Sequence, residues 1–497
     1  MKRWIILLHR YAGIPMSVVF VVWFVSGIVM IYTGGMPDVT SEMRSERLAP
    51  IDFSTVQLPL AEAVDRESLR DASLQMLLGR PLYRFRPEFG PAAAVFADNG
   101  ERFDRASLEQ ARQIAADFAG RPVDEVRFVT TIQSPDQWTI TESNNLPLDR
   151  FDVADGRGTR VYVSRSSGEV ELMTTRGTRL LAWAGAIPHW FYFTPLRTQQ
   201  PLWYWTVVWV SVAGVALALL GLVLAFTQFR RTRPFKLANA VRYRGWMRWH
   251  YYSGALFGIF AVTWAFSGLM SMEPFEWTAR QGFELPRDVL AGGPLVPADY
   301  PRTGNELVAA LAAAAPGGAP GPAGRPVEIE YLRIHDRPYL QLDYRPSTGI
   351  AQSLLDASSL TRRETPFDRD AIVARVEAAS DGVAVVQSEL MHAYDAYYYS
   401  QDDAAPLPVL RIELDDPLDT WYYVDPRTSR IVTAHHRLDR VERWLFNGLH
   451  SLDFGFWYGR RPLWDIGVIV LSLGALATSG IGLYVGWRRL LRRPVAP

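Results

Sequence analysis

Four of the eight histidines stand at matched positions in the two halves of the chain. His9 and His250 are 241 residues apart, and His189 and His450 are 261 residues apart. Internal similarity at a fixed spacing predicts two versions of one structural unit, each of which carries two histidines. The first offset also brings five further pairs of identical residues together, namely Tyr11 and Tyr252, Gly13 and Gly254, Trp23 and Trp264, Ser26 and Ser267, Gly27 and Gly268.

Paired imidazoles in an apolar environment can bind a cofactor through their ring nitrogens. An ionisable residue in a membrane helix marks a functional site by default, and bundles hold cofactors with side chains of facing helices. Two neutral imidazoles suit a b-type haem, which they bind axially from both sides. They also suit copper or zinc, although such sites usually need a third or fourth ligand. No Asp, Glu or Met is placed equivalently beside both histidines of a pair.

A second interpretation gives these histidines no chemistry. A histidine at a helix end often only meets water, and small residues in membrane helices often serve packing alone. This explanation suffices for any single histidine, whereas matched placement of all four favours cofactor ligation. His335 and His392 fall in strand or loop contexts and are expected at the surface. His435 and His436 are the substitutes if an outer ligand is assigned wrongly.

Four apolar runs are long enough to span a bilayer, which takes about 20 residues. They cover residues 5–31, 203–226, 252–272 and 464–485. The first run is long for a signal peptide and lacks a clear cleavage motif, so we expect it to remain as a span. The predicted fold class is a membrane protein: a four-helix transmembrane bundle with an internal two-fold repeat and two outer α+β domains.

Basic residues gather on one side of these spans, which predicts that both chain ends are cytoplasmic and the two long connections lie outside. The basic residues are Lys2, Arg3, Arg10, Arg230, Arg231, Arg233, Lys236, Arg242, Arg244, Arg248, Arg488, Arg489, Arg492 and Arg493.

This topology places the two pairs of histidines at different depths. His9 and His250 are at the cytoplasmic ends of spans one and three, and His189 and His450 are at the outer face, just before spans two and four. The helix from His9 to Gly27 rises roughly 27 Å, too far for one small ligand to touch both pairs. We therefore predict one site for each pair. Candidate partners for haem propionates are Arg10, Arg179 and Arg248.

The chain divides into eight predicted segments. They are span one (1–34), an outer domain (35–188), re-entry and span two (189–230), a basic loop (231–248), span three (249–273), a second outer domain (274–449) with a flexible linker (312–326), re-entry and span four (450–487), and a tail (488–497). Predicted strands are 77–85, 93–96, 126–131, 137–142, 159–163, 169–173, 329–334, 339–344, 407–413, 420–424 and 430–433. Helices are expected at 107–119, at 369–379 and, as amphipathic surface helices, before His189 and His450.

Composition excludes several classes of function. The chain has no cysteine, which excludes disulfides, iron–sulfur clusters and covalently attached haem. Its formal net charge is zero, which argues against a nucleic-acid binder. There is no Gly-rich dinucleotide motif on a cytoplasmic unit, so a flavin or NAD domain is not expected. Hydrolase motifs such as G-x-S-x-G and H-E-x-x-H are also missing.

Several short motifs resemble those of the PepSY-associated transmembrane family. His9-Arg-Tyr-Ala-Gly13 is similar to the family's opening element, and Asn447-Gly-Leu-His450 to the element before its last span. Residues 160–169 and 421–428 resemble PepSY strand–turn–strand endings. Tyr and Ser stand where the family often has Trp and Thr, at positions 11 and 451. The resemblance implies a bacterial inner-membrane protein with periplasmic PepSY domains. Some members resemble siderophore reductases with two b-type haems, which would make His9, His250, His189 and His450 the axial ligands.

Three functions follow as expectations. The first is a transmembrane di-haem reductase that takes electrons from quinol or a separate donor protein and reduces a periplasmic ferric siderophore or other chelate. The second is a PepSY protein without catalysis that binds a periplasmic peptide or partner in a regulatory role. The third is a transporter subunit, although no broken helix pair or midplane charge pair is visible.

Overall fold

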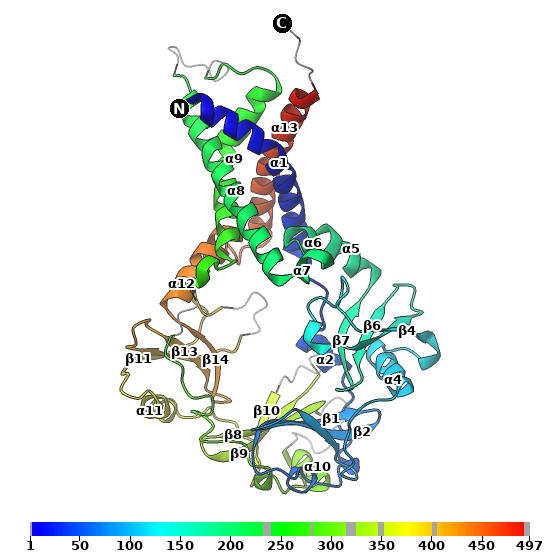
Figure 1. Cartoon of the computed structure of the whole chain (residues 1–497). Helices are drawn as coiled ribbons and strands as arrows, with labels where there is room; N and C mark the ends of the chain where they lie inside the picture. Colours follow the sequence, from blue (N-terminus) through cyan, green and yellow to red (C-terminus); the bar gives the residue numbers. More distant parts are fainter. Residues whose placement is uncertain are drawn as a thin grey trace.

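The computed structural model describes residues 2–231, 240–278, 282–314, 325–345, 352–399 and 405–491. Figure 1 shows a bundle of long helices above antiparallel sheets, with short helices between them. The start of the first helix and the end of the last lie at the far end of the bundle from the sheets, which we call the terminal end. The opposite end of the bundle is the sheet end. The predicted basic loop, linker and tail lie partly outside the described residues.

Four helices are long and apolar enough to cross a membrane, as predicted, so the chain is a membrane protein. Helix α1 contacts α8 and α13, and α9 contacts the same two helices. Helices α1 and α9 are therefore diagonal partners across the bundle, as are α8 and α13. The bounds are α1 (Lys2–Thr33), α8 (Gln200–Gln228), α9 (Trp246–Met270) and α13 (Leu463–Leu491).

The strands of the described residues form three antiparallel sheets. The central sheet has the order β10-β9-β8-β1-β2-β3, and the first and second side sheets have the orders β4-β5-β6-β7 and β11-β12-β13-β14. The bounds are β1 (Leu69–Leu77), β2 (Arg80–Pro87), β3 (Ala93–Phe96), β4 (Val126–Ile132), β5 (Leu148–Val153), β6 (Arg160–Ser164), β7 (Glu169–Thr174), β8 (Glu328–Ile334), β9 (Arg337–Asp343), β10 (Gln352–Asp356), β11 (Val385–Met391), β12 (Val409–Leu414), β13 (Trp421–Asp425) and β14 (Arg430–His435).

The central sheet joins the two outer segments of the chain. Strand β1 of the first segment pairs with β8 of the second, with Ala72 opposite Tyr331. Tyr83, Tyr331 and Tyr300 pack edge to face in the core beneath this pairing. Strand β8 was predicted from the sequence, but β1 was not, because the strand predicted at 77–85 corresponds mainly to β2. The shared sheet was therefore not foreseen.

Each side sheet is covered by one helix that packs buried side chains against it. Helix α4 (Leu108–Ala119) begins at a capping box on Ser107 and ends at Gly120, whose φ of 64° is left-handed. Its core residues include Ala111 and Ile114. Helix α11 (Arg369–Ala379) packs Ile372 and Val376 against the second side sheet. Both helices and their bounds agree with the prediction.

Short helices connect the sheets to the bundle. On the first side α5 (Arg176–Ala184), α6 (Ala186–His189) and α7 (Thr194–Arg197) lead into α8, and on the second α12 (Arg437–Arg443) and the π-helix η9 (Trp444–Gly448) precede α13. The remaining helices are α2 (Ser41–Arg47), α3 (Leu60–Ala63), α10 (Gly304–Ala314), η1 (Phe53–Thr55), η2 (Val123–Glu125), η3 (Ser143–Asn145), η5 (Pro274–Glu276) and η6 (Pro297–Asp299).

Three predicted elements were wrong. The strand predicted at 77–85 is split by a hairpin, because Leu78 and Gly79 both adopt positive φ, as a two-residue turn requires. The strand predicted at 137–142 is a turn, because the Asp136 carboxylate accepts hydrogen bonds from the backbone of Trp138 and Thr139. The linker predicted from residue 312 begins later, because α10 continues to Ala314 through an alanine run of high helix propensity.

Asp343 predicts a pH dependence of stability. It lies opposite Glu328 in the central sheet, and burial, with Glu330 and Glu328 nearby, raises its pKa to about 7. An unfolded aspartate titrates near 3.9, so the folded state binds more protons between about pH 4 and pH 7, and its stability falls as pH rises through that window. We expect Asp343→Asn to flatten this decline in the thermal unfolding midpoint.

The control is Glu67→Gln, which neutralises an exposed carboxylate. It should keep the wild-type pH profile. An unchanged decline in Asp343→Asn would show that other groups set the pH dependence.

Candidate functional site

The structure brings the four matched histidines together as two pairs. The ring centres of His9 and His250 are 6.4 Å apart, and those of His189 and His450 are 6.1 Å apart. The first pair comes from the diagonal helices α1 and α9. The second pair comes from the segments that lead into the other diagonal helices, α8 and α13. Within each pair, the two histidines therefore come from diagonal positions across the bundle axis. This is the pairing that was inferred from the depth of the histidines in the membrane.

His9 and His250 line a cavity of about 420 Å³ at the terminal end. The Nδ1 of His9 lies 3.3 Å from the carbonyl oxygen of Leu217, and that of His250 lies 3.0 Å from the carbonyl oxygen of Thr478. A carbonyl oxygen only accepts hydrogen bonds, so each Nδ1 carries the proton. In a neutral imidazole this leaves a lone pair on Nε2.

Glycines make these two contacts possible. Gly221 and Gly482 each follow by four residues the helical carbonyl that a histidine reaches, at Leu217 and Thr478. A Cβ on Gly221 would lie 3.0 Å from the Cε1 of His9, and one on Gly482 would lie 3.0 Å from the Cε1 of His250. The bare backbone lets an imidazole approach a carbonyl that already serves its own helix.

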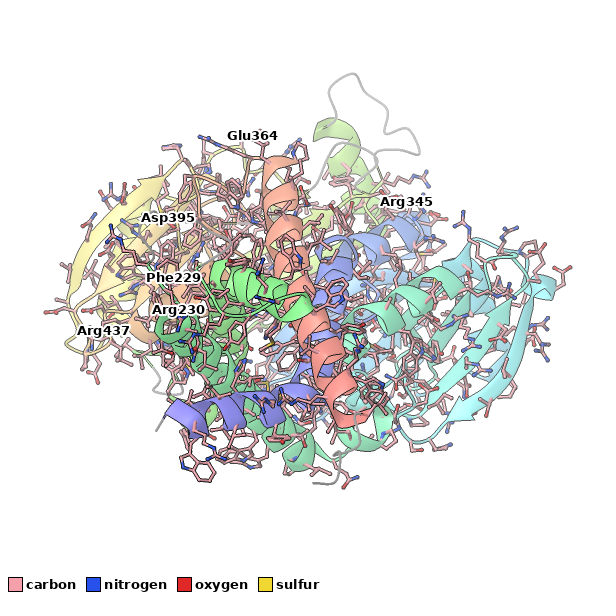
Figure 2. The ribbon with its side chains drawn as sticks, turned by 90° about the horizontal axis from the view of Figure 1, so that it is seen from above. Phe229, Arg230, Arg345, Glu364, Asp395 and Arg437 are labelled. Carbon is pink, nitrogen blue, oxygen red and sulfur yellow. The ribbon has the colours of Figure 1, made fainter. Side chains whose placement is uncertain are left out.

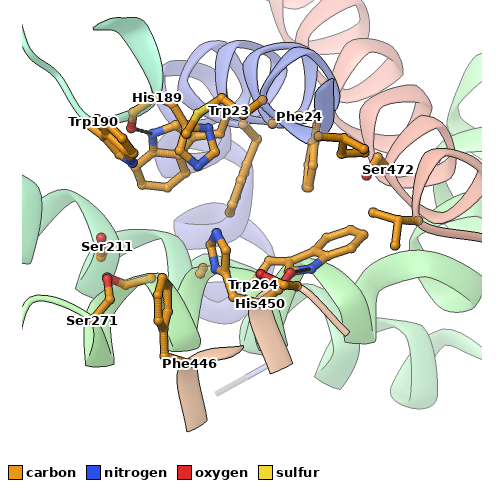
Figure 3. Close-up of a pocket in the computed structure, with 18 of the residues that line it drawn as sticks. Trp23, Phe24, His189, Trp190, Ser211, Trp264, Ser271, Phe446, His450 and Ser472 are labelled. Carbon is orange, nitrogen blue, oxygen red and sulfur yellow. Dashed lines mark hydrogen bonds between the residues drawn. The ribbon is translucent and has the colours of Figure 1, made fainter. Parts of the chain in front are cut away.

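His189 and His450 line a larger cavity of about 620 Å³ at the sheet end. Figure 3 shows the two imidazoles on opposite sides of this space, with Trp23 and Trp264 beside them. Ser26 Oγ lies 3.0 Å from the Nδ1 of His189, and Ser267 Oγ lies 2.9 Å from the Nδ1 of His450 in the same way.

The buried serines fix the same tautomer at the sheet end. The Ser26 hydroxyl donates to the Val22 carbonyl at 2.7 Å, and the Ser267 hydroxyl donates to the Trp264 carbonyl at 3.1 Å. Each hydroxyl has only one hydrogen, so it accepts from the histidine Nδ1–H. Among the described residues, Nε2 of all four imidazoles has no hydrogen-bond partner. A second hydrogen bond that holds Nδ1 is the usual companion of metal ligation through Nε2.

Two tryptophans hold the backbone of the sheet-end histidines. Trp23 Nε1 donates to the carbonyl oxygen of His189 at 3.1 Å, and Trp264 Nε1 donates to that of His450 at 2.7 Å. The matched tryptophans therefore have a defined role. Each anchors a histidine of the short connecting segment to the long helix beside it.

The donor set and its spacing fit a haem at each cavity. Two imidazoles bound through Nε2 to one metal at about 2.0–2.1 Å have ring centres about 6 Å apart, since each centre lies roughly 1.1 Å behind its nitrogen. The observed separations agree with this value. In the described part of the chain no three His, Asp or Glu side chains gather to hold a bare metal ion. The residues thus fit haem, which needs only an axial pair, better than copper or zinc.

Of the predicted arginines, only Arg10 lines one of the two histidine cavities. Arg10 borders the terminal-end cavity. Arg179 instead binds the Gly158 carbonyl, and Arg248 binds the Tyr243 carbonyl. The sequence analysis missed Arg489 at the terminal-end cavity and Arg461 at the sheet-end cavity.

The substitute histidines lie elsewhere. His436 caps α12, and His435 ends β14 beside Tyr423, where burial lowers its pKa. Neither residue lines the sheet-end cavity.

Two further tryptophans, Trp203 and Trp464, lie in the first turns of α8 and α13. Trp203 Nε1 donates to the Trp190 carbonyl at 2.8 Å, and Trp464 Nε1 donates to the Ser451 carbonyl at 3.1 Å. Each thus holds the residue that follows a paired histidine. Their offset of 261 residues, the same as that of His189 and His450, was the signal that could have identified them.

Gly482 offers a test of the terminal-end site with a matched control. In Gly482→Ala the added methyl would displace His250, at a cost of about 1–3 kcal/mol for overpacking. We expect lower occupancy of the terminal-end cofactor in the absorbance spectrum. Gly480→Ala, whose Cβ would meet no atom within 4 Å, should keep the wild-type spectrum. Equal spectra for both variants would contradict the close contact at His250.

Ser267 offers a test at the sheet end. Loss of a hydrogen bond to the second nitrogen of a ligating histidine typically costs 10–100-fold in affinity. We expect Ser267→Ala to weaken cofactor binding at the sheet end by this factor and to make the reduction potential more positive, since the imidazole becomes a weaker donor.

Ser271→Ala removes a hydroxyl that also lines the cavity but bonds to the Gly268 carbonyl rather than to a histidine. Its affinity and potential should match the wild type. A Ser267→Ala protein with wild-type values would show that the serine does not act through His450.

A family model matches most of the chain. Residues 6–361 match the family described as the PepSY-associated TM region, which covers well over half of the chain. No curated protein matches the sequence.

Proposed function

The chain belongs to the PepSY-associated TM region family, and from this premise we propose that it is a b-type haem electron-transfer protein of the bacterial inner membrane that reduces a ferric siderophore or other chelate in the periplasm. One observation carries the proposal. Each end of the bundle has two imidazoles whose ring centres are about 6 Å apart, which line one cavity and whose Nδ1 atoms are engaged, so that Nε2 is left for a ligand.

The histidines and the aromatic residues of the bundle have different roles in the proposed function. A haem in each cavity would supply one-electron redox chemistry. His9 and His250 would hold one haem, and His189 and His450 the other. Phe20 lines both cavities and stacks on Phe24. With Trp264, these two rings fill the core between the sites and exclude water from it.

The direction of transfer rests on the charge pattern. Basic residues at the terminal end favour a cytoplasmic position for that end, so the sheet end would face the periplasm. Because the sequence has no dinucleotide-binding motif, the electrons would come from quinol or a separate donor protein. Each Fe(III) takes one electron at the sheet end, and the resulting Fe(II) is bound less tightly by hard oxygen ligands.

The test is a count of haem in the purified protein by pyridine haemochrome and reduced-minus-oxidised spectra. We expect two b-type haems per chain. His9→Ala should remove one, His450→Ala should remove the other, and the double variant should be colourless.

His392→Ala is the matched control, because that histidine is exposed and lies outside both cavities. It should keep both haems. A wild-type protein without a Soret band after expression with sufficient haem would overturn the proposal and leave a PepSY protein that binds a peptide or partner.

A further inference from the structure

A further cavity, which we call the second cavity, lies beside the sheet-end site, between α12, η9 and the second side sheet. Its volume is about 410 Å³, within the usual range of small-molecule sites. Figure 1 shows α12 at the junction between the bundle and this sheet. The residues used in the argument are Tyr397, Tyr398, Tyr399, Glu442, Arg443 and Asn447.

The π-helix η9 separates this cavity from the histidine pair. Phe446 lines the sheet-end cavity and packs on the His450 ring, with centres 5.2 Å apart. The next residue, Asn447, lines the second cavity. A ligand there would be within one helical turn of His450.

The aromatic wall of the second cavity is held by hydrogen bonds. Tyr397 OH accepts from Trp444 Nε1 at 3.2 Å, and Tyr399 OH accepts from Asn447 Nδ2 at 3.1 Å. Tyr398 stacks on Tyr423, with ring centres 4.9 Å apart. The wall is therefore built before any ligand binds, which lowers the entropy cost of binding.

Buried charge lines the same cavity. Arg443 is 8% exposed, and its guanidinium donates to the carbonyls of Ala396 and Asp453. Its Nη1 has no hydrogen-bond partner in the described structure. Glu442 makes no hydrogen bond or ion pair within the described residues, and burial, with Glu273 and Asp439 nearby, raises its pKa. The Nη1 of Arg443 and the carboxylate of Glu442 would each gain a hydrogen-bond partner from a ligand that offers both donors and acceptors.

The corresponding positions of the first half are apolar. At the offset that relates His189 to His450, the residues that match Glu442, Arg443 and Asn447 are Leu181, Ala182 and Ala186. The histidines and their tryptophans are the same in both halves, whereas this wall has become polar in one half only. Cofactor binding does not explain the difference, because both halves keep the histidines.

We propose that the cavity between α12 and the second side sheet is the docking site of the electron acceptor, an oxygen-rich ferric chelate without net charge. Arg440, Arg443, Asp439 and Glu442 line it, and the buried Arg443 also pairs with the Asp453 carboxylate at 3.4 Å, so the cavity has no excess of positive charge. Such a site suits a neutral complex with amide donors and acceptors and gives no advantage to a trianionic complex. The redox role of the site rests on the proposed function, but binding does not require haem.

The test uses gallium, which has the charge and size of Fe(III) but accepts no electron. We would measure binding of a Ga(III) trihydroxamate to the full-length protein in detergent by calorimetry. We expect Glu442→Leu, which installs the residue of the first half, and Tyr399→Phe each to weaken binding at least ten-fold, with unchanged haem spectra. A Ga(III) tricatecholate, which is trianionic, should bind more weakly than the trihydroxamate.

Glu377→Leu is the matched control. It removes an exposed carboxylate from α11, which covers the opposite face of the same sheet, and should bind like the wild type. Wild-type affinity in both cavity variants, or tighter binding of the tricatecholate, would overturn the proposal. Because the gallium readout is independent of electron transfer, a protein without haem would disprove the proposed function and still test this site.

Discussion

The structure depends on how an imidazole is kept neutral and satisfied inside an apolar bundle. A buried imidazole has one N–H that must be paired and one lone pair that is available. Here a carbonyl takes the N–H of His9 and of His250, and a serine hydroxyl takes that of His189 and of His450. Both solutions leave Nε2 without a partner in a ring that lines a cavity. The glycines and serines around the histidines, which could be read as ordinary helix-packing residues, serve this single requirement.

The two histidine pairs are positioned by different parts of the structure. His9 and His250 belong to the long helices, so the bundle alone sets their spacing. His189 and His450 belong to short connections, and their positions depend on capped helices below and on tryptophans from the neighbouring long helices. The sheets therefore contribute to the geometry of the sheet-end pair. A change in the packing of the sheets can reach that pair through α5 or α12.

Most of the correct predictions about the site came from the internal repeat in the sequence. Identical residues at two fixed offsets identified the four matched histidines, because side chains that must occupy equivalent places remain the same. Their pairing was inferred from their depth in the membrane, and the long helices were predicted from apolar runs of sufficient length. The carbonyls of Leu217 and Thr478 left no such signal, since every residue has a carbonyl and only the fold selects one. The shared central sheet could not be foreseen either, because β1 was not predicted as a strand, and the pattern of β8 shows that it is a strand but does not identify its partner.

Comparison of the two halves separates two kinds of constraint. Where His189 and His450 must be held, the halves agree down to the tryptophan and serine that hold them. About two helical turns before His450 they differ in kind, with Glu442 and Arg443 in place of Leu181 and Ala182. Buried charge costs stability unless something repays it, and the first half shows that an apolar wall meets the needs of the fold. Arg443 has partners within the fold, namely the Ala396 carbonyl and the buried Asp453. Glu442 makes no hydrogen bond or ion pair among the described residues, and a ligand beside the sheet-end pair would give this carboxylate a partner.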